Sequence, residues 1–185
     1  MLFSVIVPTY NRYCSLQRLL DSLAHQSLNR SEYEIIVVDD GGIDPIETVL
    51  ADGQAYGQIR MIRQDHQGPA AARNRGSEVA QGAYLVFTDD DCVVPETWLE
   101  SWKSVLGDES ISAAGGRVQN RIPDSFPAEL SQYMISFLQT QYNSIPGKAV
   151  FLTSNNMVIH RQTFIEIGGF DTRFRTAGGE DREIA

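Results

Sequence analysis

Three short apolar runs, rich in β-branched and aromatic residues, occupy residues 3–7, 34–38 and 83–87. Runs of this length and composition are typical of buried strands. Stretches with helical spacing lie between and after them, at 13–25, 68–79 and 95–106. Strands that alternate with helices build a mostly parallel sheet with right-handed crossovers. The sequence therefore predicts an α/β fold, in which helices flank a mostly parallel sheet and the N-terminal half is Rossmann-like.

The remaining segments add shorter elements to this pattern. Residues 58–63, 111–118, 149–153 and 157–160 have the composition of strands, and residues 45–50 and 161–167 that of short helices. Within residues 127–142, apolar side chains recur at helical spacing: Leu130, Tyr133, Met134, Phe137 and Leu138. We interpret this stripe as core packing, with contact to an acceptor or to a membrane surface as the alternative.

Polar clusters follow three of the predicted strands, at residues 9–12, 39–42 and 89–91. Parallel strands point the same way, so their carboxyl ends share the edge of the sheet where open α/β sheets bind ligands. We therefore expect the three clusters to meet in one site. A further cluster, at residues 68–76, opens an alanine-rich helix, where Arg73 offers a forked set of donors to a diphosphate.

The last of these clusters contains three adjacent carboxylates, Asp89, Asp90 and Asp91. Three neighbouring negative charges repel one another, so the arrangement needs a compensating positive charge. A hard divalent cation, bound through one or two carboxylates and the phosphates of a substrate, meets that need. The alternative interpretation is a solvated acidic turn.

Length and composition narrow the class of protein. A chain of 185 residues is expected to form one domain, and its net charge of −9 argues against nonspecific nucleic-acid binding. Cys14 and Cys92 form no disulfide framework, which favours a reducing compartment. The sequence contains no signal peptide and no apolar run near the roughly 20 residues of a membrane span. We predict a cytoplasmic protein, with the inner face of the membrane as its place if it associates peripherally.

Several short motifs follow one another along the chain. They are Pro8-Thr9-Tyr10-Asn11-Arg12, Val37-Val38-Asp39-Asp40-Gly41, Ala72-Arg73-Asn74, Phe87-Thr88-Asp89-Asp90-Asp91, Gly168-Gly169-Phe170-Asp171 and Gly179-Glu180-Asp181. In this order they resemble the motifs of the family-2 glycosyltransferases, which have the GT-A fold. The resemblance covers nearly the whole chain. It implies an inverting transfer of a sugar from a nucleotide diphosphate sugar, usually with Mg²⁺ or Mn²⁺.

The resemblance also implies roles for individual residues on the donor side. Thr9 and Tyr10 would line the nucleotide pocket, and Asp39 would accept a hydrogen bond from the base, typically uracil. Arg73 would contact the nucleotide or its diphosphate. Asp89 and Asp91 would be the two ends of the family's Asp-x-Asp element, with Asp89 at the ribose and Asp91 on the metal. Asp90 is the alternative for either task. A UDP-sugar is the expected donor, with GDP and dTDP as alternatives.

On the acceptor side, Asp181 would be the general base, and Glu180 would help to bind the acceptor. Asn155 precedes a predicted strand and offers its amide to acceptor hydroxyls, with turn formation as the alternative. Residues 1–118 are then the donor-binding half and 119–185 the acceptor-side half of one GT-A domain. Family members usually continue beyond the Asp181 motif, often with a histidine that completes the metal site. We therefore expect the acceptor-side half to be truncated.

The family points to a saccharide or lipid-linked acceptor, and to polysaccharide or glycoconjugate synthesis in the bacterial cell envelope. Two alternatives remain open: a nucleotide-sugar-binding domain without turnover, and a phosphatase of the haloacid dehalogenase type. The second requires a lysine and an acidic pair downstream of the aspartate motif, whereas the pair Asp39-Asp40 lies upstream. A Ca²⁺-binding helix-loop-helix fails because Val93 and Val94 stand where its loop needs a ligand and a glycine.

Overall fold

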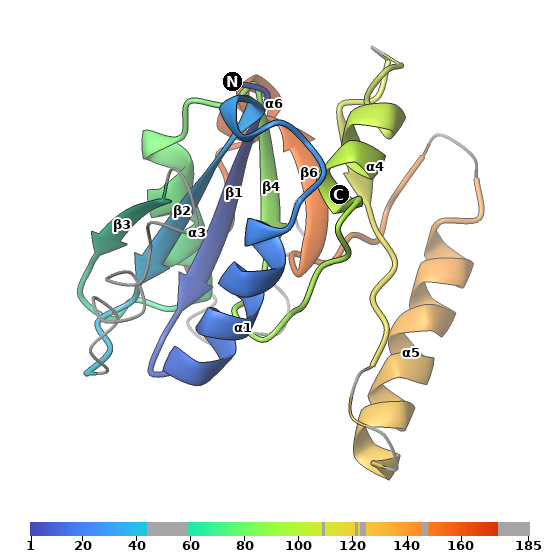
Figure 1. Ribbon diagram of the computed structural model, residues 1–185. Helices are drawn as coiled ribbons and strands as arrows, with labels where there is room; N and C mark the ends of the chain where they lie inside the picture. Colours follow the sequence, from blue (N-terminus) through green and yellow to red (C-terminus); the bar gives the residue numbers. More distant parts are fainter. Residues whose placement is uncertain (44–58, 109, 121, 123–124, 146–147, 174–185) are drawn as a thin grey trace.

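The computed structural model describes residues 1–43, 59–108, 110–120, 122, 125–145 and 148–173 (Figure 1). Its strands are β1 (Phe3–Thr9), β2 (Tyr33–Asp39), β3 (Ile59–Arg63), β4 (Tyr84–Thr88), β5 (Ala113–Gly115) and β6 (Asn156–His160). Its helices are α1 (Tyr13–Ala24), the short 3₁₀ helix η1 (Arg30–Glu32), α3 (Pro69–Val79), α4 (Trp98–Val105), α5 (Phe126–Tyr142) and α6 (Arg161–Glu166). Among the helices of this described part, none is long and apolar enough to cross a membrane.

The strands form one six-stranded sheet in the order β3-β2-β1-β4-β6-β5. The four strands β3, β2, β1 and β4 are parallel to one another, while β6 runs antiparallel to both β4 and β5. The register pairs Thr9 with Asp39 at the carboxyl ends of β1 and β2. The predicted α/β fold with a mostly parallel sheet is confirmed.

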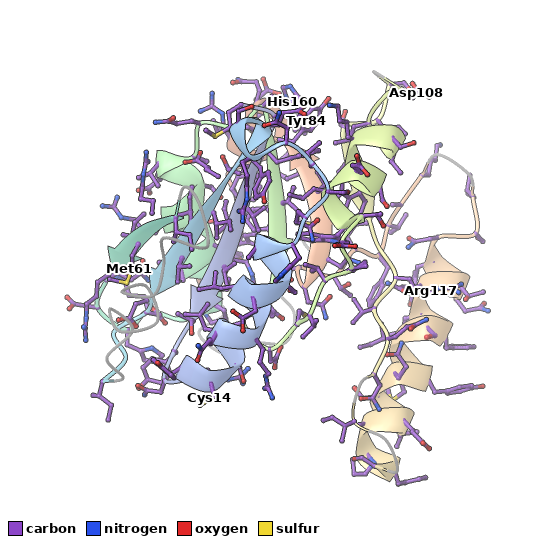
Figure 2. All side chains as sticks on the ribbon, viewed as in Figure 1. Cys14, Met61, Tyr84, Asp108, Arg117 and His160 are labelled. Carbon is purple, nitrogen blue, oxygen red and sulfur yellow. The ribbon has the colours of Figure 1, made fainter. Side chains whose placement is uncertain are left out.

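Helices cover both faces of the sheet (Figures 1 and 2). On one face, the leucines of α1 and the tryptophans of α4 pack with alternate residues of β1 and β2, such as Val5 and Ile35. On the other face, the alanines of α3 and Phe164 of α6 pack with the intervening residues, such as Ile6 and Ile36. These two cores fix the register of the strands, because a slip of one residue would exchange their faces.

A close approach of α3 to β1 depends on Gly76. A Cβ atom at this position would lie 2.6 Å from Cγ2 of Ile6, which is closer than side-chain carbons come in folded proteins. The glycine therefore lets α3 pack directly on the sheet. This contact determines where the first turns of α3, including Arg73, lie relative to the ends of the strands.

The interpretation of the 127–142 stripe as core packing is wrong. The segment forms α5, but none of its 17 residues is buried, and Leu130, Tyr133, Met134 and Phe137 are all exposed. Helical spacing indicates that a helix has an apolar face, but it does not identify what that face packs against. In Figure 1, α5 stands beside the sheet and apart from the helices that cover it.

Two predicted strands also differ from the structure. The 111–118 strand is shorter, since β5 is Ala113–Gly115 and the side-chain amide of Asn156 then bonds the carbonyl of Arg117 at 3.1 Å. Residues 149–153 form no strand, because the side chain of Asn143 bonds the backbone of Val150 and Phe151 in place of a neighbouring strand. The predicted 45–50 helix lies outside the described residues, as do Glu180 and Asp181.

Candidate active site at the carboxyl edge of the sheet

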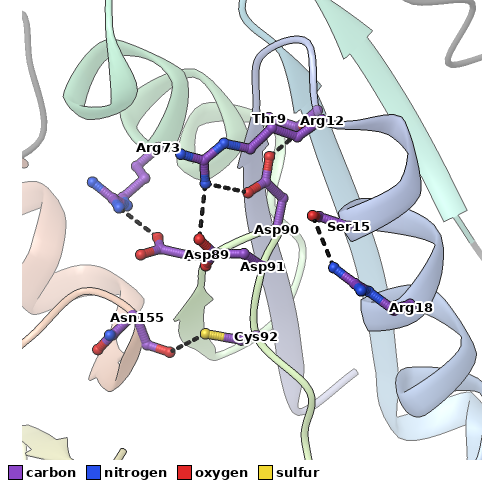
Figure 3. Close-up of polar contacts among 10 residues, drawn as sticks. All are labelled: Thr9, Arg12, Ser15, Arg18, Arg73, Asp89, Asp90, Asp91, Cys92 and Asn155. Carbon is purple, nitrogen blue, oxygen red and sulfur yellow. Dashed lines mark hydrogen bonds and ion pairs between the residues drawn. The ribbon is translucent and has the colours of Figure 1, made fainter. Parts of the chain in front are cut away.

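The acidic cluster lies directly after β4, beside the end of β1 (Figure 3). The Thr9 hydroxyl donates to Oδ2 of Asp90 at 2.8 Å. Arg12, in the loop after β1, donates to Oδ1 of Asp90 at 3.2 Å and to Oδ2 of Asp91 at 2.9 Å. The expected meeting of these two loops at one edge is confirmed. Asp90 is buried and points inward, while the Asp91 side chain is 55% exposed.

Arg73 approaches the same cluster from α3. Its guanidinium donates to Oδ1 of Asp89 at 2.7 Å, and its side chain is buried while that of Asp89 is 33% exposed. The guanidinium also lies over the ring of Phe170, 5.5 Å from its centroid. Arg12 and Arg73 thus supply positive charge that the three carboxylates need, a task that sequence reasoning had assigned to a divalent cation alone. The place of Arg12, in a loop at the same edge as the three carboxylates, could have identified it as their partner from the sequence.

Asp39 is the last residue of β2 and Asp40 follows it, and the two carboxylates contact different parts of the edge. The Asp39 carboxylate is buried, accepts the backbone N–H of Gly42 at 2.9 Å and lies 3.5 Å from Nε of Arg63. The Asp40 carboxylate turns to the loop that leads into α3. It accepts the backbone N–H groups of Gln67 at 2.9 Å and Gly68 at 2.8 Å.

Two side chains of the same loop complete the shell around Asp40. Nε2 of Gln64 donates to Oδ1 of Asp40 at 2.7 Å, and Nδ1 of His66 lies 2.9 Å from Oδ2. The buried Asp40 carboxylate therefore holds residues 64–68 against the end of β2. Sequence reasoning gave Asp40 no separate role, because an Asp-Asp pair after a strand does not show which carboxylate turns inward to the backbone.

Tyr10 lies on the outer side of this loop. Its ring stacks on that of His66, with centroids 4.2 Å apart and planes 23° from parallel. Its side chain is 44% exposed. Through His66, the position of Tyr10 depends on the loop that Asp40 fixes. The arrangement offers an exposed aromatic surface at the edge where Thr9 and Asp39 end their strands.

The Gly-Gly-Phe-Asp motif is tied to α3 by Asn74. The Asn74 amide donates to the carbonyl of Phe170 at 2.8 Å and accepts its backbone N–H at 2.9 Å. Gly169, with φ of +74°, adopts the left-handed conformation that favours glycine, and a Cβ there would lie 2.7 Å from Oδ1 of Asn74. Two motifs almost a hundred residues apart in sequence therefore form one unit beside Arg73.

Asn155 and Cys92 lie below the acidic cluster in Figure 3. The Cys92 thiol is 3.9 Å from the backbone carbonyl of Asn155, and the side-chain oxygen of Asn155 is buried without a hydrogen-bond donor in the described part of the chain. Burial raises the pKa of the Cys92 thiol to about 11. The thiol therefore stays protonated at neutral pH, which excludes it as a nucleophile.

Burial raises the pKa of Asp90 to about 6, although the Thr9 hydroxyl and Arg12 oppose the shift. In the unfolded chain its pKa is about 3.9. Folding thus favours the protonated form, so the stabilisation that it gives is present below about pH 4 and is lost as pH rises through 6. We expect the free energy of unfolding of the metal-free protein to fall by about 3 kcal/mol more over this range than that of Asp90→Asn. Urea denaturation with EDTA at several pH values measures the difference, and parallel profiles for the two proteins would contradict it.

The exposed carboxylates of the edge have the chemistry of a divalent-cation site. Asp89 and Asp91 offer the oxygen ligands that Mg²⁺ and Mn²⁺ prefer. Within the described residues, no three or more His, Cys, Asp or Glu side chains are grouped to hold a metal by themselves. A cation that takes its other ligands from water and substrate phosphates needs only one or two carboxylates. The edge fits a cation bound together with a phosphorylated ligand.

The mostly parallel six-stranded sheet, flanked by helices, has the architecture of the GT-A glycosyltransferases that the chain resembles in structure. The family model described as glycosyl transferase family 2 matches residues 4–168. The chain therefore belongs to glycosyltransferase family 2, and the expectation from its motifs is confirmed.

Two curated relatives illustrate the range of the family. Glycosyltransferase AglE of Haloferax volcanii is 29% identical over 177 residues, which cover 95% of this chain and 58% of that protein. Validoxylamine A glucosyltransferase of Streptomyces hygroscopicus subsp. jinggangensis is 33% identical over 217 aligned residues, which cover 99% of this chain and 50% of that protein. The chain spans about half the length of these relatives.

Solved structures confirm the fold. The S. aureus TarS 1-349 structure in complex with UDP superposes with a TM-score of 0.79 at 21% identity, covering 98% of this chain and 53% of that chain. The mannosyltransferase PcManGT from Pyrobaculum calidifontis, in complex with GDP-Man and Mn2+, superposes with a TM-score of 0.78 at 23% identity, covering 98% and 49%.

The phosphatase alternative gains no support from the structure. Its mechanism requires a lysine beside the aspartate motif, and the sequence contains two lysines, Lys103 and Lys148. Lys103 pairs with Glu32 at 2.6 Å, just before β2, at the end of the sheet opposite to the acidic cluster. In the described structure the cationic partners of the cluster are arginines, which suit diphosphate binding.

Proposed function

We propose that this protein transfers a sugar from a nucleotide diphosphate sugar to an acceptor hydroxyl, with inversion at the anomeric carbon. The observation that carries the proposal is the edge itself. There the partly exposed carboxylate of Asp89 and the exposed carboxylate of Asp91 lie with Arg12 and Arg73 at the ends of parallel strands. Related folds support it, since the solved neighbours include complexes with UDP, UDP-GlcNAc and GDP-Man. A UDP-sugar is our first choice of donor.

The donor side of the site is assigned as follows. Thr9, Tyr10 and Asp39 line the nucleotide pocket, with Asp39 toward the base. Arg73 faces the diphosphate, and Asp89 the ribose. Asp90, bonded to Thr9 and Arg12 within the protein, holds the loop after β1 in place beside the nucleotide.

Asp91 would hold Mg²⁺ or Mn²⁺ together with the diphosphate of the donor. When bound, the cation supplies positive charge that stabilises the leaving nucleoside diphosphate. Arg12 already lies on the Asp91 carboxylate, so Asp91 must share or exchange this partner when a cation binds. Arg12 and Arg73 add positive charge of their own at the edge, and this charge needs no metal.

On the acceptor side, Asp181 acts as general base, and Glu180 and Asn155 bind the acceptor, a saccharide or lipid-linked hydroxyl compound. A sugar hydroxyl is a poor nucleophile at neutral pH, so a carboxylate takes its proton as the new C–O bond forms. The anomeric bond to the diphosphate breaks in the same step, and the nucleoside diphosphate leaves from the opposite face. Inversion follows from this geometry. Polysaccharide or glycoconjugate synthesis at the inner face of the membrane is the setting that we propose.

Incubation with UDP-sugars or GDP-Man, Mn²⁺ and simple saccharide acceptors tests this function. We expect release of the nucleoside diphosphate, and NMR of the product should show the anomeric configuration opposite to that of the donor. A product of retained configuration would contradict the mechanism. Donor binding without transfer to any acceptor would assign the chain as a nucleotide-sugar-binding domain instead.

A further inference from the structure

A groove lies between α5 and the segment after β5 that carries Arg117, which runs alongside the helix (Figure 2). Its volume is about 860 Å³, and eleven residues line it, from 117–120 and 122 on one side and from α5 on the other. This volume falls within the range of about 300–1,000 Å³ that is typical of small-molecule sites. We call it the α5 groove.

Polar side chains line most of the α5 groove. Nine of its eleven residues carry hydrogen-bonding groups, and the other two are Val118 and Ile122. Gln132 ties the two sides together, since its amide donates to the carbonyl of Val118 at 2.9 Å. Five other lining side chains have no hydrogen-bond partner within the described residues: Arg117, Gln119, Glu129, Tyr133 and Gln139. Their donors and acceptors are therefore available to a ligand in the groove.

The α5 groove adjoins the edge of the sheet where the acidic cluster lies. Thr88, the last residue of β4, pairs with Asn156 of β6, and Asp89 follows it directly. The side-chain amide of Asn156 donates to the carbonyl of Arg117 at 3.1 Å, which ties this lining residue to the same edge. The lining residues of α5 span about 16 Å along the helix axis. In Figure 1, α5 reaches beyond the edge of the sheet, so the groove is long enough for a chain of sugars.

We propose that the α5 groove binds a neutral oligosaccharide, namely the sugars of a chain-like acceptor that lie beyond the hydroxyl to be glycosylated. The inference rests on the proposed function and narrows its acceptor to a saccharide chain. Amides, hydroxyls and carboxylates pair with the many hydroxyls of a sugar ring. Tyr133 is 71% exposed and offers an aromatic face on which the apolar side of a sugar ring packs.

Charge and polarity favour a neutral saccharide over other polymers. The lining contains one cation, Arg117, and one anion, Glu129, so their formal charges cancel. A single-stranded nucleic acid is instead held by a positively charged groove. A peptide is usually anchored in apolar pockets or along an exposed sheet edge, whereas Val118 and Ile122 are the aliphatic residues of this lining.

Titration of the isotope-labelled full chain with chitotetraose, cellotetraose and maltotetraose, followed by NMR, tests the proposal. N-acetylglucosamine and glucose are the matching monosaccharides. We expect at least one tetrasaccharide to bind with a Kd of about 0.1–1 mM, at least tenfold more tightly than its monosaccharide, because several rings contact the groove at once. No tetrasaccharide bound more tightly than its monosaccharide would overturn the proposal. A flexible Gly-Ser peptide that occupies the groove while the tetrasaccharides do not would assign it to a peptide instead.

Variants of α5 locate the binding. Tyr133→Ala and Gln139→Ala should each weaken tetrasaccharide binding by about fivefold or more. Met134→Ala, next to Tyr133 and exposed but outside the lining, should leave it unchanged. Circular dichroism checks that all three variants are folded. Binding that both Tyr133→Ala and Gln139→Ala retain would place the saccharide elsewhere and overturn the assignment of the groove.

Binding of UDP to the same proteins separates this inference from the proposed function. Tyr133→Ala should bind UDP with Mn²⁺ as wild type does, because α5 contributes no residue to the donor side that we assign. Wild-type protein that binds UDP but no tetrasaccharide would keep the donor assignment and overturn the groove. Wild-type protein that binds a tetrasaccharide, with loss in Tyr133→Ala, but no nucleoside diphosphate would keep the groove as a saccharide site and overturn the proposed function.

Discussion

Asp181→Asn should lower the rate of sugar transfer by about 10²–10⁴-fold while leaving the affinity for the nucleotide donor unchanged. Asparagine has nearly the shape of aspartate, but its amide cannot take the proton of the acceptor hydroxyl. The acceptor must then attack as a neutral alcohol or lose its proton to water. In our assignment, donor binding depends on the edge formed by β1, β2 and β4, whereas Asp181 acts on the acceptor. Steady-state rates with saturating donor, together with titration of the nucleoside diphosphate, measure the two quantities.

The neighbouring residue provides a matched control for this prediction. We assign Glu180 to acceptor binding, so Glu180→Gln should raise KM for the acceptor with a much smaller loss of kcat. Equal losses of kcat in the two variants would show that the acids act as one structural unit. A full rate of transfer in Asp181→Asn would remove Asp181 from the mechanism.

Asp40→Ala should destabilise the protein by about 4 kcal/mol. The substitution leaves two backbone N–H groups, those of Gln67 and Gly68, without the acceptor that they have in the folded protein. The Gly68 donor is buried, and a buried donor left unsatisfied costs roughly 1–3 kcal/mol. The Gln67 donor is only partly buried, and its hydrogen bond and the contacts of Gln64 and His66 with the carboxylate are lost as well. Urea denaturation followed by tryptophan fluorescence measures the free energy of unfolding.

Two further variants serve as controls for the Asp40→Ala prediction. Asp65→Ala removes an exposed carboxylate from the same loop and should change stability by less than about 0.5 kcal/mol. Asp40→Asn keeps one acceptor oxygen and should lie between the other two. The loop 64–68 carries His66, whose ring stacks on that of Tyr10, and leads into α3. Because we assign Tyr10 and Arg73 of α3 to the nucleotide site, we also expect Asp40→Asn to weaken nucleotide binding. Stability equal to wild type in Asp40→Ala would show that the loop keeps its position without the carboxylate.

The site was predictable from the sequence where chain direction determines position. Parallel strands bring Thr9 and the acids after β4 to one edge, so their meeting followed from the strand pattern. The roles of Asp90 and Asp40 did not follow, because the direction of each side chain in a short loop depends on hydrogen bonds to distant backbone groups. Asp90 turns inward to Thr9, whereas Asp89 and Asp91 remain at the surface.

The fold, too, was predictable where the residue pattern alone determines the structure, and not where distant contacts do. The buried strands and α1 were predictable because their apolar residues match the period of the element and face a core. For α5, the apolar spacing predicts the helix correctly but not its surroundings, because spacing shows that a helix has an apolar face and does not show what covers that face. Residues 149–153 have the composition of a strand, but Asn143 satisfies their backbone groups locally.

Calorimetric titration of the protein with UDP, with and without Mn²⁺, tests the central claim that the carboxyl edge is a metal-assisted nucleotide-sugar site. We expect binding to wild-type protein that Mn²⁺ strengthens, and an Asp91→Ala variant in which this strengthening is lost. GDP and dTDP in place of UDP determine the preference for the base. Failure of all three nucleoside diphosphates to bind folded wild-type protein, with and without Mn²⁺, would contradict the assignment of the edge as the donor site.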